Sequence, residues 1–503
     1  MLGIRFYRSR ADYLDGDFCA KPSVDKPMKL VTLLIVGVLL VSNSKSLLGQ
    51  EEAYVPEKDR QVLKKLDDWQ NMKFGLLMHW GPYSQWGIVE SWSICSEDVD
   101  WCRRPKGISY VDYVKKYEEL PKTFNPINFD PERWARAAKD AGMKYVVFTT
   151  KHHDGFCMFD TKYTDYKITA SDVPFHANPR ANVAKEIFSA FRREGMGIGA
   201  YFSKPDWHSD DYWAPEWATP DRNNNYDTRK YPERWQRFRD FTYNQINELT
   251  TEYGPVDILW LDGGWVKVRK EPFDATVGSG RVPWQQDIDM GRIAAMARKN
   301  QPGIIIVDRD VPGPYENYRT PEQQVPNKPL SYPWETCMTM ATSWSYVPND
   351  AYKPPRQLIH LLVDIVAKGG NFLLNVGPSP TGELAPEAYD RMREIGAWMK
   401  INSEAIYNTR PIAPYKEGKI CFTSLSDGTV YAIYLADEDE TEPPAKVWLT
   451  GFTPKAGAKL QLLGSTTPLT WERIGKGVLI DIPDAVRNKA SGKYAWTIKI
   501  AAF

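Results

Sequence analysis

An acidic residue that directly follows an apolar run is the first candidate for chemistry. Asp262 comes after Leu259–Leu261 and precedes two glycines, so a ligand can approach the backbone closely beside its carboxylate. A carboxylate at the end of a buried strand is expected to have either a structural partner or a function, because burying an unpaired charge costs free energy. With a protonated carboxyl about 5 to 5.5 Å away, it can be the nucleophile of a retaining glycosidase. We therefore predict a catalytic role for Asp262, rather than a helix cap or a loop contact.

Two glutamates and one arginine are candidate partners. Glu322 stands in a polar stretch that can form a long loop, and Glu335 stands at the start of an apolar run. A loop glutamate can also be a solvated surface residue, so the residues alone do not rank the two as general acid and base. Arg309 is expected to orient a carboxylate or donate to a hydroxyl, unless it is paired with Asp308 or Asp310.

Three of the six histidines lie at the ends of two apolar runs: His79 and the adjacent pair His152 and His153. A metal-dependent hydrolase is one interpretation of the pair. However, the chain has no H-E-x-x-H string and no third ligand at a metal-binding spacing, and adjacent strand residues point to opposite faces. Neutral imidazoles that hydrogen-bond sugar hydroxyls are favoured, and no metal is predicted.

These residues need a scaffold that brings the ends of separate runs together. The predicted strands are 74–80, 144–151, 197–203, 257–261, 303–307, 334–339 and 371–376, and the predicted helices are 130–141, 181–194, 233–253, 284–300, 355–368 and 386–402. This alternation is typical of βα units around a parallel sheet. It predicts an α/β fold, a (β/α)8-like TIM barrel over residues 50–407, with chemistry at the C-terminal ends of the strands. A doubly wound sheet is the alternative, but no G-x-G-x-x-G string follows the first strand.

The texture of the chain changes after residue 407. Short alternating runs at 420–423, 429–435, 446–449, 478–482 and 494–500 are separated by Gly, Asp and Pro, and no helical period is visible. We predict a C-terminal antiparallel β-sandwich over residues 408–503.

The first 49 residues are predicted to be a signal region. The apolar run 30–41 follows Lys26 and Lys29 and is too short to cross a bilayer of about 30 Å as a helix. Met28 directly precedes Lys29 and is the expected true start of translation. The protein is therefore predicted to be exported to a periplasmic, extracellular or lysosome-like compartment, with no membrane span after signal removal.

Composition limits the partners. The 503 residues carry 64 basic and 64 acidic side chains; removal of residues 1–49 takes away seven basic and four acidic ones, which leaves a net charge of −3. Such a chain carries no strong positive charge that would attract nucleic acid, and its 42% apolar content argues against global disorder. The 19 Trp, 27 Tyr and 19 Phe weakly indicate sugar binding. Five cysteines follow the signal region without a C-x-x-C string, and the sequence does not decide whether Cys95 and Cys102 form a disulfide.

Six strings, taken together and in order, resemble the α-L-fucosidase family of retaining glycoside hydrolases, family 29. They are FGLLMHWG (74–81), ESWS (90–93), the segment from KY (144–145) to KHHDGF (151–156), WLDGG (260–264), WETCMT (334–339) and NFLLNVGP (371–378). They cover the whole predicted barrel.

The resemblance implies that Asp262 is the nucleophile and that fucosylated glycans are the substrates, cleaved without a cofactor at their terminal α-L-fucosyl residues. The residues that match substrate-binding positions are His79, Glu90, Trp92, His152, His153, Arg309 and Trp344. Glu322 matches the acid/base of the broad-specificity subgroup. Glu335 matches that of the linkage-restricted subgroup and is kept as a binding residue or as the alternative acid/base. Two alternative functions remain: a glycosidase for another sugar such as galactose, and a sugar-binding protein without turnover. The sequence does not predict the oligomeric state.

Overall fold

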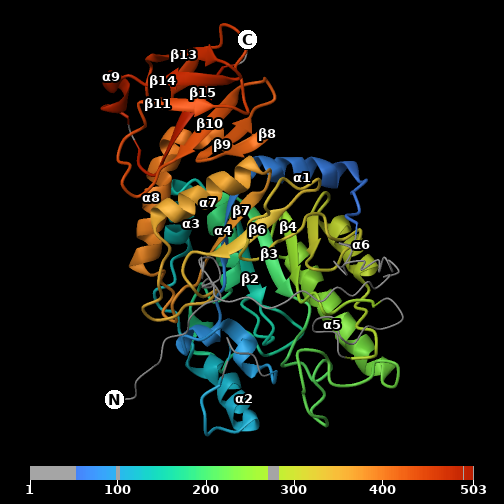
Figure 1. Ribbon diagram of the computed structural model, residues 1–503. Helices are drawn as coiled ribbons and strands as arrows, with labels where there is room; N and C mark the ends of the chain where they lie inside the picture. Colours follow the sequence, from blue (N-terminus) through green and yellow to red (C-terminus); the bar gives the residue numbers. More distant parts are fainter. Residues whose placement is uncertain (1–52, 98–101, 103, 270–281, 491, 502–503) are drawn as a thin grey trace, which may run out of the picture. The chain divides into compact units, whose positions relative to one another are not determined.

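The apolar runs predicted as strands fold as parallel strands in the computed structural model, which describes residues 53–97, 102, 104–269, 282–490 and 492–501. The predicted signal region 1–49 and the start at Met28 lie outside these ranges. The strands are β1 (Phe74–Met78), β2 (Tyr145–Lys151), β3 (Gly197–Ser203), β4 (Ile258–Asp262), β5 (Ile305–Asp308), β6 (Glu335–Thr339) and β7 (Asn371–Val376). They form one sheet in the order β5-β4-β3-β2-β1-β7-β6. Strands β2, β3, β4, β6 and β7 of this sheet are labelled in the centre of Figure 1.

The segment 316–323 occupies the place between β5 and β6. Glu316 bridges to β5 through Val307, while Arg319 and Glu322 bridge in parallel to Trp334 and to Cys337 of β6. An irregular segment thus takes the eighth position of the ring. It brings Glu322 to the same end of the sheet as the residues that follow the strands.

Helices return the chain between the strands. Their bounds are α1 (Arg60–Met72), α2 (Tyr110–Glu118), α3 (Pro131–Asp140), α4 (Val183–Arg193), α5 (Pro232–Thr251), α6 (Met290–Asn300), α7 (Pro355–Ala367) and α8 (Pro386–Asn402), with short 3-10 turns η1 (Pro82–Gln85), η2 (Glu90–Ile94), η4 (Leu120–Thr123), η5 (Pro174–Ala177) and η6 (Ser403–Ala405). Sequence signals explain several starts. Asp130, for example, accepts a 2.9 Å hydrogen bond from the Arg133 amide, and Pro131 occupies the first helical position. None of the helices in the described ranges is long and apolar enough to span a bilayer.

The helix predicted over 284–300 is wrong at its start. It begins at Met290, because Asp289 adopts a left-handed conformation and its carboxylate caps the helix by accepting from the Arg292 amide. Trp284 instead belongs to the preceding loop, where its indole donates to Asn224 Oδ1 at 2.8 Å.

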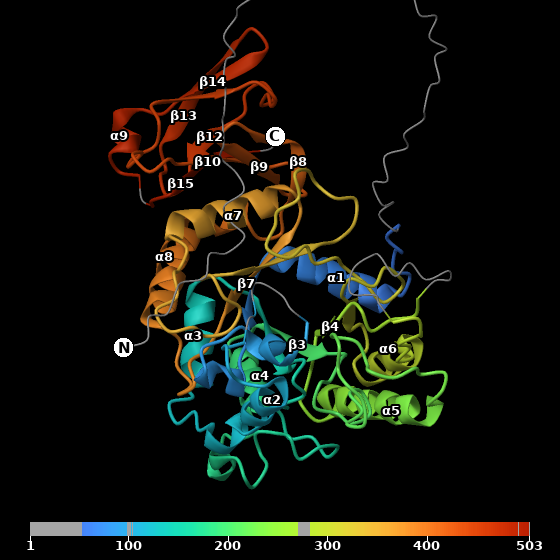
Figure 2. The same cartoon turned by 60° about the horizontal axis from the view of Figure 1, so that its bottom comes forward.

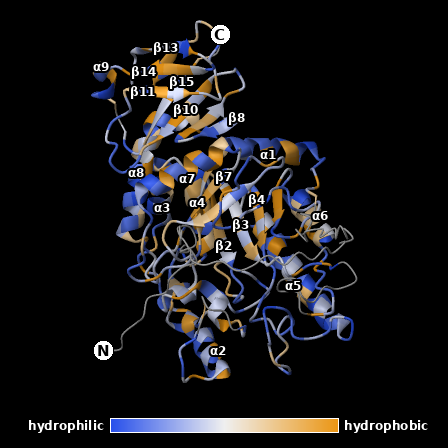
Figure 3. Ribbon diagram, in the orientation of Figure 1, coloured by the Kyte–Doolittle hydropathy of each residue, from blue (hydrophilic) through white to orange (hydrophobic). Residues whose placement is uncertain are grey.

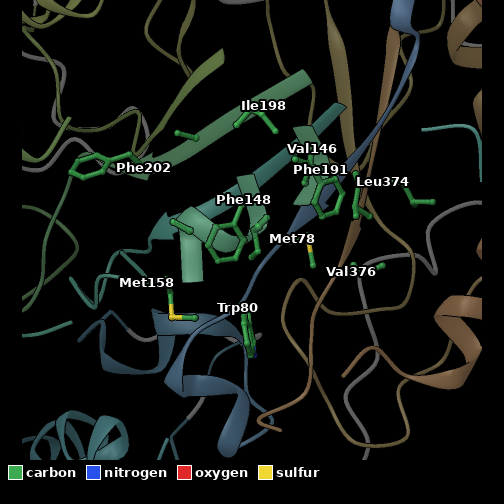
Figure 4. Packing of buried hydrophobic residues seen from close by; sticks show 14 of the residues in the cluster. Met78, Trp80, Val146, Phe148, Met158, Phe191, Ile198, Phe202, Leu374 and Val376 are labelled. Carbon is green, nitrogen blue, oxygen red and sulfur yellow. The ribbon is translucent and has the colours of Figure 1, made fainter. Parts of the chain in front are cut away.

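Alternation along each strand divides the barrel side chains into an outer and an inner set. In the outer set, Met78 of β1 lies opposite Phe148 of β2, and Figure 4 shows both in the cluster that also holds Phe191 of α4. Figure 3 shows hydrophobic colours concentrated around these strands. The inner set packs with Trp69 of α1 and with Tyr318. The barrel is therefore filled by side chains rather than hollow.

The C-terminal region is antiparallel throughout its described strands. These are β8 (Arg410–Glu417), β9 (Ile420–Ser424), β10 (Val430–Leu435), β11 (Lys446–Leu449), β12 (Leu460–Leu462), β13 (Pro468–Ile474), β14 (Gly477–Asp481) and β15 (Ala495–Ile500), with the short helix α9 (Asp484–Arg487). This region has its own apolar core. It also contacts α7 and α8, since His360 hydrogen-bonds the Tyr494 carbonyl at 2.8 Å and Trp398 donates to the Ala495 carbonyl at 2.9 Å (Figures 1 and 2).

Candidate active site

The alternation that packs the barrel also aims the candidate residues at its C-terminal mouth. Trp260 of β4 points into the barrel, and Asp262, two residues further, points the same way. His79 and Arg309 likewise stand two residues after inward-facing residues of β1 and β5. The strand ends therefore converge on one site, as expected for this fold.

These side chains line a cavity of about 570 Å³, a size typical of small-ligand sites. Nine of the ten predicted site residues line it: His79, Glu90, Trp92, His152, His153, Asp262, Arg309, Glu322 and Trp344. Glu335 does not.

Asp262 is held as a carboxylate. Its Oδ2 accepts a 2.7 Å hydrogen bond from the Tyr201 hydroxyl, and its Oδ1 accepts from Arg309 Nη1 at 3.1 Å and from the Gly263 amide at 2.8 Å. Burial alone would raise its pKa, but the positive charge of Arg309 and these donors bring the pKa well below its ordinary value. His153 Nε2 lies 3.8 Å from Oδ2. An ionised, oriented carboxylate with one edge toward a cavity has the properties of a nucleophile.

One guanidinium joins the two candidate catalytic carboxyls. Arg309 donates from Nη1 to Asp262 and from Nη2 to Glu322, and its Nε donates to Thr320 Oγ1 at 3.1 Å. Its charged group also lies over the Trp260 ring, 5.3 Å from the centroid. Arg309 is thus paired with the carboxyls of the site, and not with Asp308 as one interpretation of the sequence had it. The shared guanidinium brings the carboxyls of Asp262 and Glu322 to the same part of the cavity.

The three histidines are neutral near pH 7. His79 donates from Nδ1 to Asn375 Oδ1 at 2.7 Å, since the amide nitrogen of Asn375 is used on the Trp344 carbonyl. His152 Nδ1 lies 2.5 Å from the Ser91 hydroxyl. Burial lowers the pKa of His79 and of His153 to about 4, and that of His152 well below its ordinary value. They can therefore exchange hydrogen bonds with hydroxyl groups as neutral rings.

Glu90 is a buried carboxyl on the cavity wall. It accepts from the Ser345 amide at 2.9 Å, and burial raises its pKa to about 8, so it is protonated at neutral pH. Trp344 precedes Ser345 and packs on His79, with ring centroids 5.3 Å apart. Trp92 stands edge-on to His153 at 5.2 Å. This part of the wall combines neutral hydrogen-bonding groups with flat apolar faces, which suits a sugar.

Glu335 lies in the floor of the barrel instead of in the cavity. It is the first residue of β6, fully buried, and accepts hydrogen bonds from Tyr145, from Tyr318 at 3.2 Å and from the Trp260 indole at 3.4 Å. The N-terminal end of a strand is far along the barrel axis from the C-terminal mouth, so its side chain meets other strands and not the cavity.

Sequence reasoning missed several lining residues. Tyr201 of β3 lines the cavity, whereas its neighbour Phe202 belongs to the outer core. The alternation of side chains along β3, counted back from its end, could have identified Tyr201 as the inward-facing residue. Arg222, on the long loop 204–231 between β3 and α5, carries no such signal. Neither does Lys267.

The candidate residues in the described part of the chain do not form a metal centre. Within the described ranges, no group of three or more His, Cys, Asp or Glu side chains is arranged to hold a metal ion. Cys95 and Cys102 are both buried free thiols.

Comparison with known proteins decides the family. The family described as "Alpha-L-fucosidase" matches residues 41–404, and "Alpha-L-fucosidase C-terminal domain" matches residues 415–501. The chain belongs to the α-L-fucosidase family. The family's curated members include the α-L-fucosidase of Branchiostoma floridae, 26% identical over 92% of this chain and 99% of that protein, and the tissue α-L-fucosidase of Mus musculus, 27% identical over 89% and 94%. The assignment to this hydrolase family from sequence strings is confirmed.

Solved structures of family members have the same fold. α-L-fucosidase isoenzyme 1 from Paenibacillus thiaminolyticus aligns with a TM-score of 0.69 at 30% identity, covering 88% of this chain and 99% of that one. A Thermotoga maritima α-fucosidase in complex with fucose aligns with a TM-score of 0.67 at 24% identity, covering 89% and 100%. The predicted barrel followed by a β-sandwich is confirmed.

Proposed function

We propose that this chain is an exported, retaining exo-α-L-fucosidase that removes terminal α-L-fucosyl residues from oligosaccharides or glycoconjugates by double displacement. The observation that carries the proposal is the pair Asp262 and Glu322, joined through Arg309 at the mouth of the barrel.

In the first step, Asp262 attacks the anomeric carbon. The bond to the glycosidic oxygen breaks, and Glu322 in its acid form transfers a proton to that oxygen, so the aglycone leaves as an alcohol. Glu322 suits the transfer because it lines the cavity and 42% of its side chain is exposed. Arg309 keeps the attacking carboxylate ionised and oriented.

In the second step, Glu322 as a carboxylate takes a proton from water, and the water oxygen attacks the anomeric carbon. The ester to Asp262 breaks and fucose leaves with its original configuration. During both steps the sugar hydroxyls are held by His79, His152, His153 and Glu90, none of which carries a charge at neutral pH.

The aromatic residues Trp92 and Trp344 complete the recognition of fucose. The methyl group of a 6-deoxy sugar buries apolar area against such faces, whereas a hydroxymethyl group would leave its hydroxyl without a partner.

The test is hydrolysis of an aryl α-L-fucoside beside aryl galactosides, with the first-formed product observed by NMR. We expect turnover of the fucoside, with α-L-fucose formed before mutarotation and no effect of EDTA. Preference for a galactoside would indicate another sugar specificity. Binding without turnover would indicate a non-catalytic protein, and loss of activity in EDTA would indicate a metal-dependent hydrolase.

Export is proposed from the basic flank and short apolar run at 30–41. The names of some relatives, such as the plasma α-L-fucosidase of Homo sapiens, agree with a protein found outside cells. N-terminal sequencing of the native protein should begin near residue 50; a start at Leu2 would contradict the proposal.

A further inference from the structure

Arg222 lies in the cavity without a role in the proposed chemistry. It belongs to the loop 204–231, and its carbonyl accepts three hydrogen bonds. Two come from the same loop, from the Trp207 indole at 3.2 Å and the Tyr212 hydroxyl at 2.9 Å, and one comes from the Trp265 indole at 3.1 Å, which follows β4. Three aromatic donors on one carbonyl hold the backbone of Arg222 in place.

The guanidinium of Arg222 is oriented as well. It lies over the rings of Trp92 and Trp265, 4.8 Å and 5.4 Å from their centroids, and it pairs with Glu97 through Nε at 2.9 Å and through Nη2. Among contacts with the described residues, Nη1 makes no hydrogen bond. The side chain keeps 21% of its surface exposed while it lines the cavity, so donors of Nη1 are available to a ligand.

Two tryptophans connect Arg222 to the surroundings of the nucleophile. His153 lies 3.8 Å from Asp262, and the rings of Trp92 and Trp265 each lie within 5.2 Å of the His153 ring, centroid to centroid. Arg222 stacks on these two tryptophans. Trp92 and Trp265 therefore contact both Arg222 and His153, the residue beside Asp262.

Building on the proposed function, we propose that Arg222 recognises the sugar to which fucose is attached, by donating from Nη1 to its hydroxyl groups. Glu97 holds the guanidinium at the correct angle, and the two tryptophans support it from one side. A planar, pre-oriented donor suits this task, because little side-chain entropy is lost on binding. Arg222 would then set the preference of the enzyme for the aglycone.

The test compares kcat/KM on an aryl α-L-fucoside with kcat/KM on fucosyl-disaccharides of different linkage, using the linkage that the wild type cleaves best. For Arg222→Met, which keeps the apolar stem, we expect the ratio of glycan to aryl kcat/KM to fall about tenfold, mainly through a higher glycan KM. Arg222→Lys keeps the charge but not the planar fork, and should lower the ratio in the same direction.

The control is Arg237→Met. Arg237 pairs with Asp211 of the same loop but lies outside the cavity, and this variant should keep the wild-type ratio. A ratio for Arg222→Met and Arg222→Lys that stays within twofold of wild type would overturn the proposal, whether or not overall activity falls. Failure of the proposed function looks different, since the wild type itself would then not cleave the aryl fucoside.

Discussion

Glu335→Gln tests whether Glu335 is a structural acid in the barrel floor. The carboxyl is fully buried and accepts hydrogen bonds from Tyr145, Tyr318 and Trp260. Burial raises its pKa from an ordinary 4.5 to about 7, although these hydrogen bonds act in the opposite direction. Glutamine has the same shape and does not titrate.

The size of the effect follows from the two pKa values. Below pH 4.5 the folded and unfolded states both hold the proton, and Glu335 adds no pH dependence. Between the two values the unfolded chain loses the proton while the folded protein keeps it, so the free energy of unfolding falls as pH rises. Above a pH of about 7 the loss is constant, at about 3 kcal/mol for a shift of this size.

Urea unfolding, followed by tryptophan fluorescence at pH 5 and pH 8, measures this pH dependence of the free energy of unfolding. The free energy of unfolding of the wild type, relative to that of Glu335→Gln, should fall by about 2 to 3 kcal/mol between the two pH values. Glu335→Gln should also cleave fucosides with poor leaving groups. Parallel pH profiles, together with a loss of that cleavage by more than about 100-fold, would contradict a structural role for Glu335 and make it the acid/base.

Three further predictions concern the site and its support. Asp262→Gly should lower kcat on an aryl fucoside by at least about 1,000-fold, with azide restoring formation of an inverted fucosyl azide; full residual activity would contradict the nucleophile assignment. Glu322→Ala should lose about 10² to 10⁴ in kcat on substrates with poor leaving groups and give a retained azide product, and normal cleavage of those substrates would exclude it as the acid/base. Lys204→Met breaks a buried 2.5 Å ion pair with Asp308 and should cost about 3 to 5 kcal/mol in urea unfolding, whereas a cost below about 1 kcal/mol would show that the pair contributes little.

Local pattern was sufficient to predict the parallel strands and the residues at their ends. Each strand is buried on both faces, so its run of apolar residues is visible in the sequence, and the polar residue that ends it stands out. Asp262, His79 and Arg309 were predicted for that reason. The end of the run also predicts the end of the barrel at which such a side chain lies.

Other features depend on contacts between distant segments, which no local pattern contains. Arg222 reaches the cavity on a long loop in which its carbonyl is held by Trp207 and Tyr212 of that loop and by Trp265 from after β4. Glu335 lies outside the cavity because β6 begins at the opposite end of the barrel. The segment that carries Glu322 has no strand pattern of its own, although it bridges β6. The helix α1 was not predicted, although its buried residues Val62, Leu66 and Trp69 follow a helical spacing.

The most direct test of the account is to trap the covalent intermediate. The enzyme is incubated with a 2-deoxy-2-fluoro-α-L-fucosyl donor that has a good leaving group, then digested, and the labelled peptide is sequenced by mass spectrometry. We expect one fluorofucosyl group per chain, attached to Asp262. A label on any other residue, or turnover of aryl α-L-fucosides that gives the inverted product first, would contradict it.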